Sequence, residues 1–105
     1  MSGLGEMGNL LKQAQEMQRQ LDAVRTELRG RSIEGTSAGG VVRVTLSADR
    51  HEVRSVEVGA MASAEPSVLE DALCAALRDA LKRAAEAERE AIGRITGGMN
   101  LPGLL

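Results

Sequence analysis

A helical repeat from residue 67 to residue 96 constrains this chain more than any other feature. Its apolar stripe consists of Leu69, Leu73, Leu77, Ala80, Ala84, Ala87, Ala91 and Ile95, widened by Ala72, Ala76, Leu81 and Ile92. Steps of three and four residues are those of one face of an α-helix. Such a helix would measure about 45 Å at 1.5 Å per residue, whereas a compact domain of about 100 residues has a radius of gyration of about 13 Å. The helix therefore has to project beyond the body on which it packs.

Both ends of this predicted helix have residues that are typical of helix termini. Ser67 followed by Glu70 has the spacing of a capping box. Pro66 fits a helix start, because proline cannot continue a helix backward. The helix is expected to end at Gly97-Gly98, with Pro102 preventing a restart.

A second helical repeat lies earlier in the chain, over about residues 9–29. Its stripe consists of Leu10, Ala14, Met17, Leu21, Val24 and Leu28. The steps alternate between four and three, which is heptad-like spacing, and the helix would be about 30 Å long. Asn9 is a suitable N-cap and Gly30 a natural stop. Residues 1–8, with three glycines and no periodicity, and residues 97–105 are expected to be flexible tails.

Between the two helices, residues 33–58 alternate between apolar and polar side chains, as antiparallel strands do. The apolar members are Ile33, Val42, Val44, Leu46, Val56 and Val58. A tight turn is expected at residues 48–51, between the last two of three strands. Val53 is out of phase with Val56 and Val58, which indicates either a bulge or an exposed valine.

Together these elements predict an α+β fold of order α-β-β-β-α, with a three-stranded antiparallel sheet and two long terminal helices, as a single domain over residues 1–105. Both helices overhang a sheet about 15 to 20 Å across, so their overhanging parts are expected to pack antiparallel. This would make a two-helix arm whose tip holds the start of the first helix and the end of the second. The chain has no Phe, Tyr or Trp, and a small core without aromatic side chains favours further burial between subunits.

The sequence offers little for catalysis or metal binding. His51 is expected to be a surface residue in the predicted turn. Cys74, the only cysteine, has apolar neighbours and is expected to be a small buried residue rather than a reactive thiol. Glu86 and Glu90 fit a salt-bridged solvent face better than an acid–base pair. We therefore expect no enzyme, no metal site and no cofactor.

The charge pattern leaves two interpretations open. The net charge is −2 and the pI is about 5.4, so the chain lacks the basic excess usual in nucleic-acid-binding proteins. Arg78, Lys82 and Arg89 share one face of the second helix, and Lys12 and Arg19 one face of the first. Such stripes fit either a solvated face or a surface that follows phosphates. We see no signal peptide and no membrane-spanning stretch, so we expect a cytoplasmic protein.

Four stretches of the sequence resemble the YbaB/EbfC family of bacterial nucleoid-associated proteins. They are MGNLLKQAQEMQRQL, EGTSAGGVVRVTLSADRHEVRSVEV, LEDALCAALRDALKRA and TGGMNLPG, and the resemblance extends from about residue 7 to residue 103. It implies a tweezers-like homodimer with a body of sheets and two projecting arms of paired helices. It also implies a nucleoid protein whose arms bind double-stranded DNA, largely nonspecifically, with roles in nucleoid organisation and gene regulation.

Under this resemblance the DNA-binding candidates are Lys12, Gln15, Gln18, Arg19, Arg78, Lys82, Arg89 and Arg94. Four of them, Lys12, Arg19, Arg89 and Arg94, are expected at the arm tips. Phosphate contacts position a protein without reading sequence, so binding should be sensitive to salt. The alternative is an adaptor dimer whose arms grip recombination or replication proteins, and a third possibility is a purely structural dimer.

Overall fold

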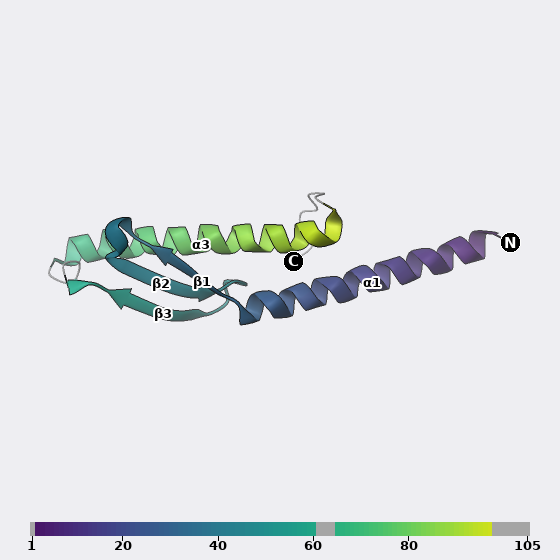
Figure 1. Cartoon of the computed structure of the whole chain (residues 1–105), viewed down its shortest axis with the longest axis horizontal. Helices are drawn as coiled ribbons and strands as arrows, with labels where there is room; N and C mark the ends of the chain where they lie inside the picture. Colours follow the sequence, from purple (N-terminus) through teal and green to yellow (C-terminus); the bar gives the residue numbers. More distant parts are fainter. Residues whose placement is uncertain (1, 61–64, 98–105) are drawn as a thin grey trace.

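The computed structural model describes residues 2–60 and 65–97, and Figure 1 shows the whole chain. The elements are α1 (Ser2–Gly30), β1 (Ser32–Thr36), the short 3-10 turn η1 (Ala38–Gly40), β2 (Val42–Ser47), β3 (Val53–Val58) and α3 (Pro66–Thr96). The predicted α-β-β-β-α order and the antiparallel sheet are confirmed. The expectations for Gly98, for Pro102 and for most of the C-terminal tail lie outside the described residues.

The sheet has the order β1-β2-β3 and one apolar face. The register pairs Ile33 with Leu46 and Val44 with Val56, so apolar side chains of all three strands lie on the same side. α3 covers this face over β1 and β2 (Figure 1). Polar side chains such as Glu34 occupy the opposite face. The fold is therefore a two-layer arrangement in which the helix covers only part of the sheet.

α3 approaches the sheet closely because residue 35 is glycine. A Cβ atom placed on Gly35 would lie 2.2 Å from the backbone nitrogen of Ala80 and 2.5 Å from the carbonyl oxygen of Ala76. Contacts under about 3 Å do not occur between such atoms without a shift of the backbone. The backbone of α3 thus rests directly on β1.

This close approach changes which residues of α3 are buried. The fully buried side chains are alanines, at positions 76, 80, 84, 87 and 91. Leu69, Leu73 and Leu77, expected in the centre of the stripe, are half-buried, and Leu81 is 46% exposed. Only the smallest side chains fit where helix and sheet backbones touch, so the leucines lie on the flanks.

The expectation that Cys74 is buried is wrong. Its side chain is exposed. The buried line of α3 passes through Ala76 and Ala80, and residue 74 lies about 120° around the helix from residue 80 at 100° per residue. The apolar neighbours in the sequence therefore did not indicate the direction of this side chain.

A second core attaches α1 to the body. Leu21, Val24 and Leu28 are buried, and the last two pack with the alanines of the second half of α3. Residues 3–20 of α1 are exposed, except for half-buried Gly8. The molecule measures 75 × 21 × 16 Å, with a radius of gyration of 19.7 Å, so a projecting arm is present.

The arm differs from the expected one, in which the start of the first helix and the end of the second lie at the same tip. Arg94, near the end of α3, forms an ion pair with Glu27 of α1 at 3.4 Å. In the described part of the chain, α1 continues alone beyond this point (Figure 1). The start of the first helix and the end of the second are therefore not together at one tip.

The helix ends also differ in part from the prediction. α1 begins at Ser2 rather than at Asn9, and Leu4, Met7 and Leu11 continue the helical spacing toward this start. The described part of residues 1–8 is therefore helical.

α3 lacks the predicted capping box. Its N-cap is Glu65, which makes no side-chain capping bond, and Pro66 occupies the first turn. Gly97 ends α3 as expected, in a left-handed conformation, with its N–H donating to the carbonyl of Gly93.

Replacing Gly35 by alanine is expected to lower the free energy of unfolding by about 3 kcal/mol, because the new methyl group must push two backbones apart. Urea unfolding followed by circular dichroism measures this. Gly93→Ala is the matched control in α3, since a Cβ there meets nothing within 4 Å, and it should stabilise the helix by up to about 1 kcal/mol. Equal stabilities of the two variants would contradict the backbone contact.

A carboxylate of α3 also holds the edge of β1. The N–H of Thr36 donates to Oδ2 of Asp79 at 2.9 Å, and Nε of Arg83 donates to the same oxygen at 3.1 Å. The Thr36 hydrogen bond, followed by that from Arg83, holds the pKa of Asp79 below its ordinary value of 3.8. The folded chain therefore binds a proton at Asp79 less readily than the unfolded chain.

The stabilisation from the Asp79 carboxylate should be present above about pH 4 and should be lost as the pH falls through the lowered pKa of the folded state. The Asp79→Asn variant has no carboxylate at this position, so its stability cannot show this pH-dependent loss. In urea unfolding between pH 7 and pH 2.5, the wild type should be more stable than Asp79→Asn at neutral pH, and the difference should shrink below pH 3.8. A difference that stays constant across this range would contradict the role of Asp79.

Candidate nucleic-acid interface

The outward face of α3 carries three cations in a row. Arg78, Lys82 and Arg89 are exposed, and their spacing places them on the side of the helix opposite buried Ala80. In the part of the chain that the structure describes, none of the three has an ion-pair or hydrogen-bond partner. We call these three residues the α3 ridge. They span about 16 Å along the helix at 1.5 Å per residue.

α1 carries a second and more mixed group of candidates. Lys12 and Gln15 are exposed, and their side chains form no hydrogen bond or ion pair with another described residue. Arg19 forms an ion pair with Glu16 at 2.6 Å, and Gln18 donates a hydrogen bond to Asp22 at 3.3 Å. Exposed pairs of this kind contribute at most about 1 kcal/mol, so a phosphate competes easily for Arg19.

The sequence-predicted residues do not form one cluster. Arg94 is paired with Glu27, which is about 22 Å along α1 from Lys12 at 1.5 Å per residue. Arg89 lies on the outer face of α3 with the other ridge residues. The structure thus gives two separate groups, the α3 ridge and the polar side chains of projecting α1.

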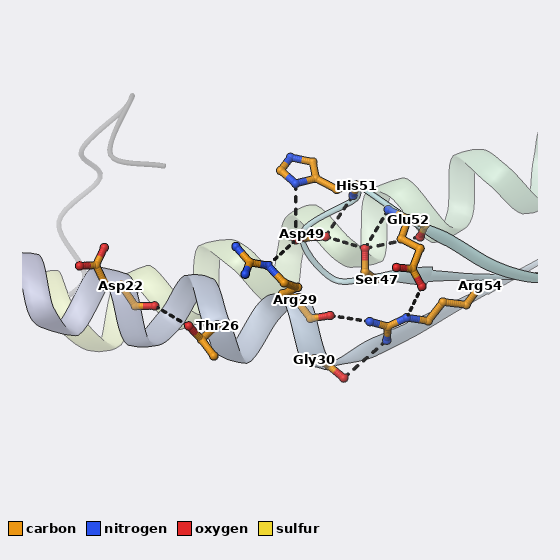
Figure 2. A network of polar contacts seen from close by, with 9 residues as sticks. All are labelled: Asp22, Thr26, Arg29, Gly30, Ser47, Asp49, His51, Glu52 and Arg54. Atoms are coloured by element: carbon orange, nitrogen blue, oxygen red, sulfur yellow. Dashed lines mark hydrogen bonds and ion pairs between the residues drawn. The ribbon is translucent and has the colours of Figure 1, made fainter.

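A network of polar contacts joins the end of α1 to the β2–β3 turn (Figure 2). Oδ2 of Asp49 lies 4.0 Å from Nε of Arg29. The Ser47 hydroxyl donates to Oδ1 of Asp49 at 2.5 Å, and the backbone N–H of His51 donates to the same oxygen at 3.0 Å. The hydrogen bond from Ser47, followed by that from His51, holds the pKa of Asp49 below its ordinary range.

Ser47, Asp49 and His51 do not have the arrangement of a catalytic triad. The carboxylate lies between the other two groups, and the hydroxyl of Ser47 donates to it rather than to the imidazole. A serine nucleophile needs a base that accepts its proton and is itself oriented by a third group. The three side chains therefore fasten a turn. The expectation of a surface histidine is confirmed, because the side chain of His51 is 85% exposed.

Arg54 of β3 is a site residue that the sequence analysis missed. Its guanidinium donates to the carbonyls of Arg29 and Gly30 and, at 2.7 Å, to the hydroxyl of Ser32. The register between β2 and β3 shifts beside Arg54. Leu46 pairs with Val53, but the preceding residue, Thr45, pairs with Ser55. The out-of-phase valine was the one sequence signal for this bulge.

A cavity of about 200 Å³ lies beside this network. It is lined by Arg25, Leu28, Arg29, Asp49, Arg50, His51 and Glu88. Its arginines have acidic partners, since Arg25 contacts Asp22 at 2.8 Å and Arg50 contacts Glu88 at 2.6 Å. Paired charges leave little attraction for a further anion.

Two features are absent from the described residues. They contain no cluster of three His, Cys, Asp or Glu side chains able to hold a metal ion. Neither described helix combines the length and the apolar character that crossing a bilayer requires.

The fold resembles that of a solved protein. The uncharacterized protein HP0035 from Helicobacter pylori superposes with a TM-score of 0.72 at 18% sequence identity, over 89% of this chain and 96% of that chain. At this identity the likeness shows the fold alone.

The family match covers almost the whole chain. Residues 3–99 match the YbaB/EbfC DNA-binding family, in agreement with the resemblance carried by the sequence motifs. The protein therefore belongs to the YbaB/EbfC family of DNA-binding proteins.

Proposed function

We propose that this protein is a nucleoid-associated homodimer that binds double-stranded DNA largely without regard to sequence, and acts in nucleoid organisation and gene regulation. Membership of a DNA-binding family supports DNA as the ligand. The observation that carries the proposal on this chain is the α3 ridge, whose three cations are exposed and form no ion pair with a described residue. The expected location is the cytoplasm, at the nucleoid.

The ridge suits phosphates better than base edges. B-DNA carries one negative charge per about 1.7 Å of its axis, so a straight row of cations about 16 Å long can lie along the backbone. Arginine and lysine contacts to phosphate fix orientation but carry no sequence information. The net charge of −2 per chain opposes approach at long range, so binding depends on local contact.

An uncovered part of the sheet supports the homodimer. Val53, Val56 and Val58 lie on the apolar face but are 58%, 47% and 43% exposed, because α3 covers β1 and β2 instead. Leu81 is exposed on the flank of α3 that adjoins β3. It lies two turns before Glu88 on the same side of the helix, and Glu88 forms an ion pair with Arg50 in the β2–β3 turn. We call Val53, Val56, Val58 and Leu81 the apolar shelf. A second copy would bury both this shelf and the edge of β3.

A second candidate function is the protein-interaction adaptor. It is favoured by the apolar side chains on the projecting part of α1, where Leu4, Met7, Leu10 and Leu11 are each more than half exposed. Exposed apolar groups of this kind contribute nothing to phosphate binding, but they suit contact with a protein. Salt separates the two functions, because phosphate binding weakens steeply with ionic strength and apolar contact does not.

DNA binding is tested by fluorescence anisotropy with random duplexes at several salt concentrations. Three ridge contacts per chain in a dimer predict a slope of log K against log salt of about −5. The triple variant Arg78→Ala, Lys82→Ala, Arg89→Ala should lose most of this binding equally for all duplexes. Arg43→Ala on the opposite face of the sheet is the control and should change affinity less than about twofold. Absence of wild-type binding at low salt would contradict the proposal.

The dimer is tested by light scattering of Val56→Asp. A charge in the middle of the apolar shelf is costly to bury, so this variant should have the mass of a single chain at concentrations where the wild type has twice that mass. Ser55→Asp, on the polar face of the same strand, is the control and should remain dimeric. A Val56→Asp variant with the wild-type mass would place the interface elsewhere, and a monomeric wild type would contradict the homodimer itself.

A further inference from the structure

The direction of α1 depends on a small area of contact. Among residues 3–30 of this helix, whose burial the structure describes, only Leu21, Val24 and Leu28 are buried. Val24 and Leu28 share a cluster with Ala84, Ala87 and Ala91 of α3, and half-buried Ile95 packs against it. The alanines contribute only single methyl groups to this contact. Apolar burial of this kind holds two helices together but resists rolling and sliding weakly, because few side chains interdigitate. Directional polar contacts are needed to fix the angle.

Arg54 makes such contacts at the point where α1 meets the sheet. The last carbonyls of an α-helix have no partner within the helix and carry partial negative charge. The Arg54 guanidinium donates to two of them, on Arg29 and Gly30, and to the hydroxyl of Ser32 on β1. Nε of Arg54 also lies 3.4 Å from a carboxylate oxygen of Glu52. One planar cation thus connects α1, β1 and β3. Figure 2 shows its bonds to Arg29 and Gly30 of α1.

The register shift explains how a strand residue reaches a helix end. A bulge places two residues opposite one, bends its strand and re-aims a side chain. Here Val53 and Ser55 pair with consecutive residues of β2, so Arg54 between them has no partner in that register. Its side chain is 26% exposed and lies against the end of α1 (Figure 2).

We propose that Arg54 is a positioning residue that fixes the angle at which α1 projects from the sheet. It thereby sets where Lys12 and Arg19 are held relative to the α3 ridge. Its effect on the direction of α1 follows from the contacts above, whereas its effect on DNA binding rests on the proposed function. Asp49, 4.0 Å from Arg29, supports the same helix end from the neighbouring turn.

The direction of α1 is measured by double electron–electron resonance, which gives the distance between two spin labels. Spin labels at Gln13→Cys on α1 and Glu34→Cys on β1 are introduced into a Cys74→Ser chain, and the labelled protein is diluted with unlabelled chain so that distances within one chain dominate. Arg54→Gln is compared with Arg43→Gln, which removes the same charge from the same sheet without touching α1. We expect a broadened or shifted distance distribution for Arg54→Gln and an unchanged one for Arg43→Gln. Coinciding distributions would overturn the proposal.

Arg54→Lys provides a second test that keeps the charge. Lysine has no planar fork and cannot bind both carbonyls and the Ser32 hydroxyl in the same way. Its distribution should be intermediate between those of the wild type and Arg54→Gln, and it remains informative if Arg54→Gln does not fold. A wild-type distribution in both Arg54 variants would show that the charge and the fork are dispensable, and would overturn the proposal.

The same variants separate this inference from the proposed function. Without the Arg54 contacts, α1 presents its cations at variable positions, so Arg54→Gln should bind random duplexes at least about threefold more weakly than Arg43→Gln. An altered distance distribution with unaltered DNA affinity would support the positioning role and overturn the part played by α1 in DNA binding. Weaker binding with an unaltered distribution would overturn the positioning role.

Discussion

A backbone-to-backbone contact between β1 and α3, possible because residue 35 has no side chain, sets the distance between the two layers. The contact admits only alanines along the centre of α3, at positions such as Ala76 and Ala80. The leucines are therefore displaced to the flanks, and the helix covers β1 and β2 but leaves the valines of β3 uncovered. The exposed shelf and the alanine surface that receives α1 are both consequences of this short distance.

The distribution of charge follows from the same packing. Because the inner face of α3 is committed to the sheet, its cations at positions 78, 82 and 89 point away from it. On the same helix, the carboxylate of Asp79 accepts hydrogen bonds from the Thr36 N–H and from Arg83. An acidic chain can therefore present a locally cationic surface, since part of its negative charge is held in structural bonds.

Periodicity predicted the elements well and their contacts less well. The strand alternation, the helical repeat of α3 and the stop at Gly97 all depend on local sequence, and the structure confirms them. The exposure of Cys74 depends on which side of α3 is turned toward the sheet. The burial of alanine in place of leucine depends on how closely two backbones approach. That distance is set by Gly35, which resembles any other glycine in the sequence. The separation of Arg94 from Lys12 likewise depends on where α3 ends beside α1, and the role of Arg54 depends on a bulge.

The solitary part of α1 has a consequence for cooperativity. Residues 3–20 are exposed apart from half-buried Gly8, so their helix depends mainly on local hydrogen bonds. Isolated helices of this length are only marginally stable in water. We therefore expect this segment to unfold separately, with amide hydrogens that exchange through local opening more readily than those of β2 and α3. The glycines at positions 3, 5 and 8 lower its helix propensity. A ligand that binds this segment as a helix must offset the free-energy cost of ordering it. The glycines raise that cost, so they lower the affinity for such a ligand without contacting it.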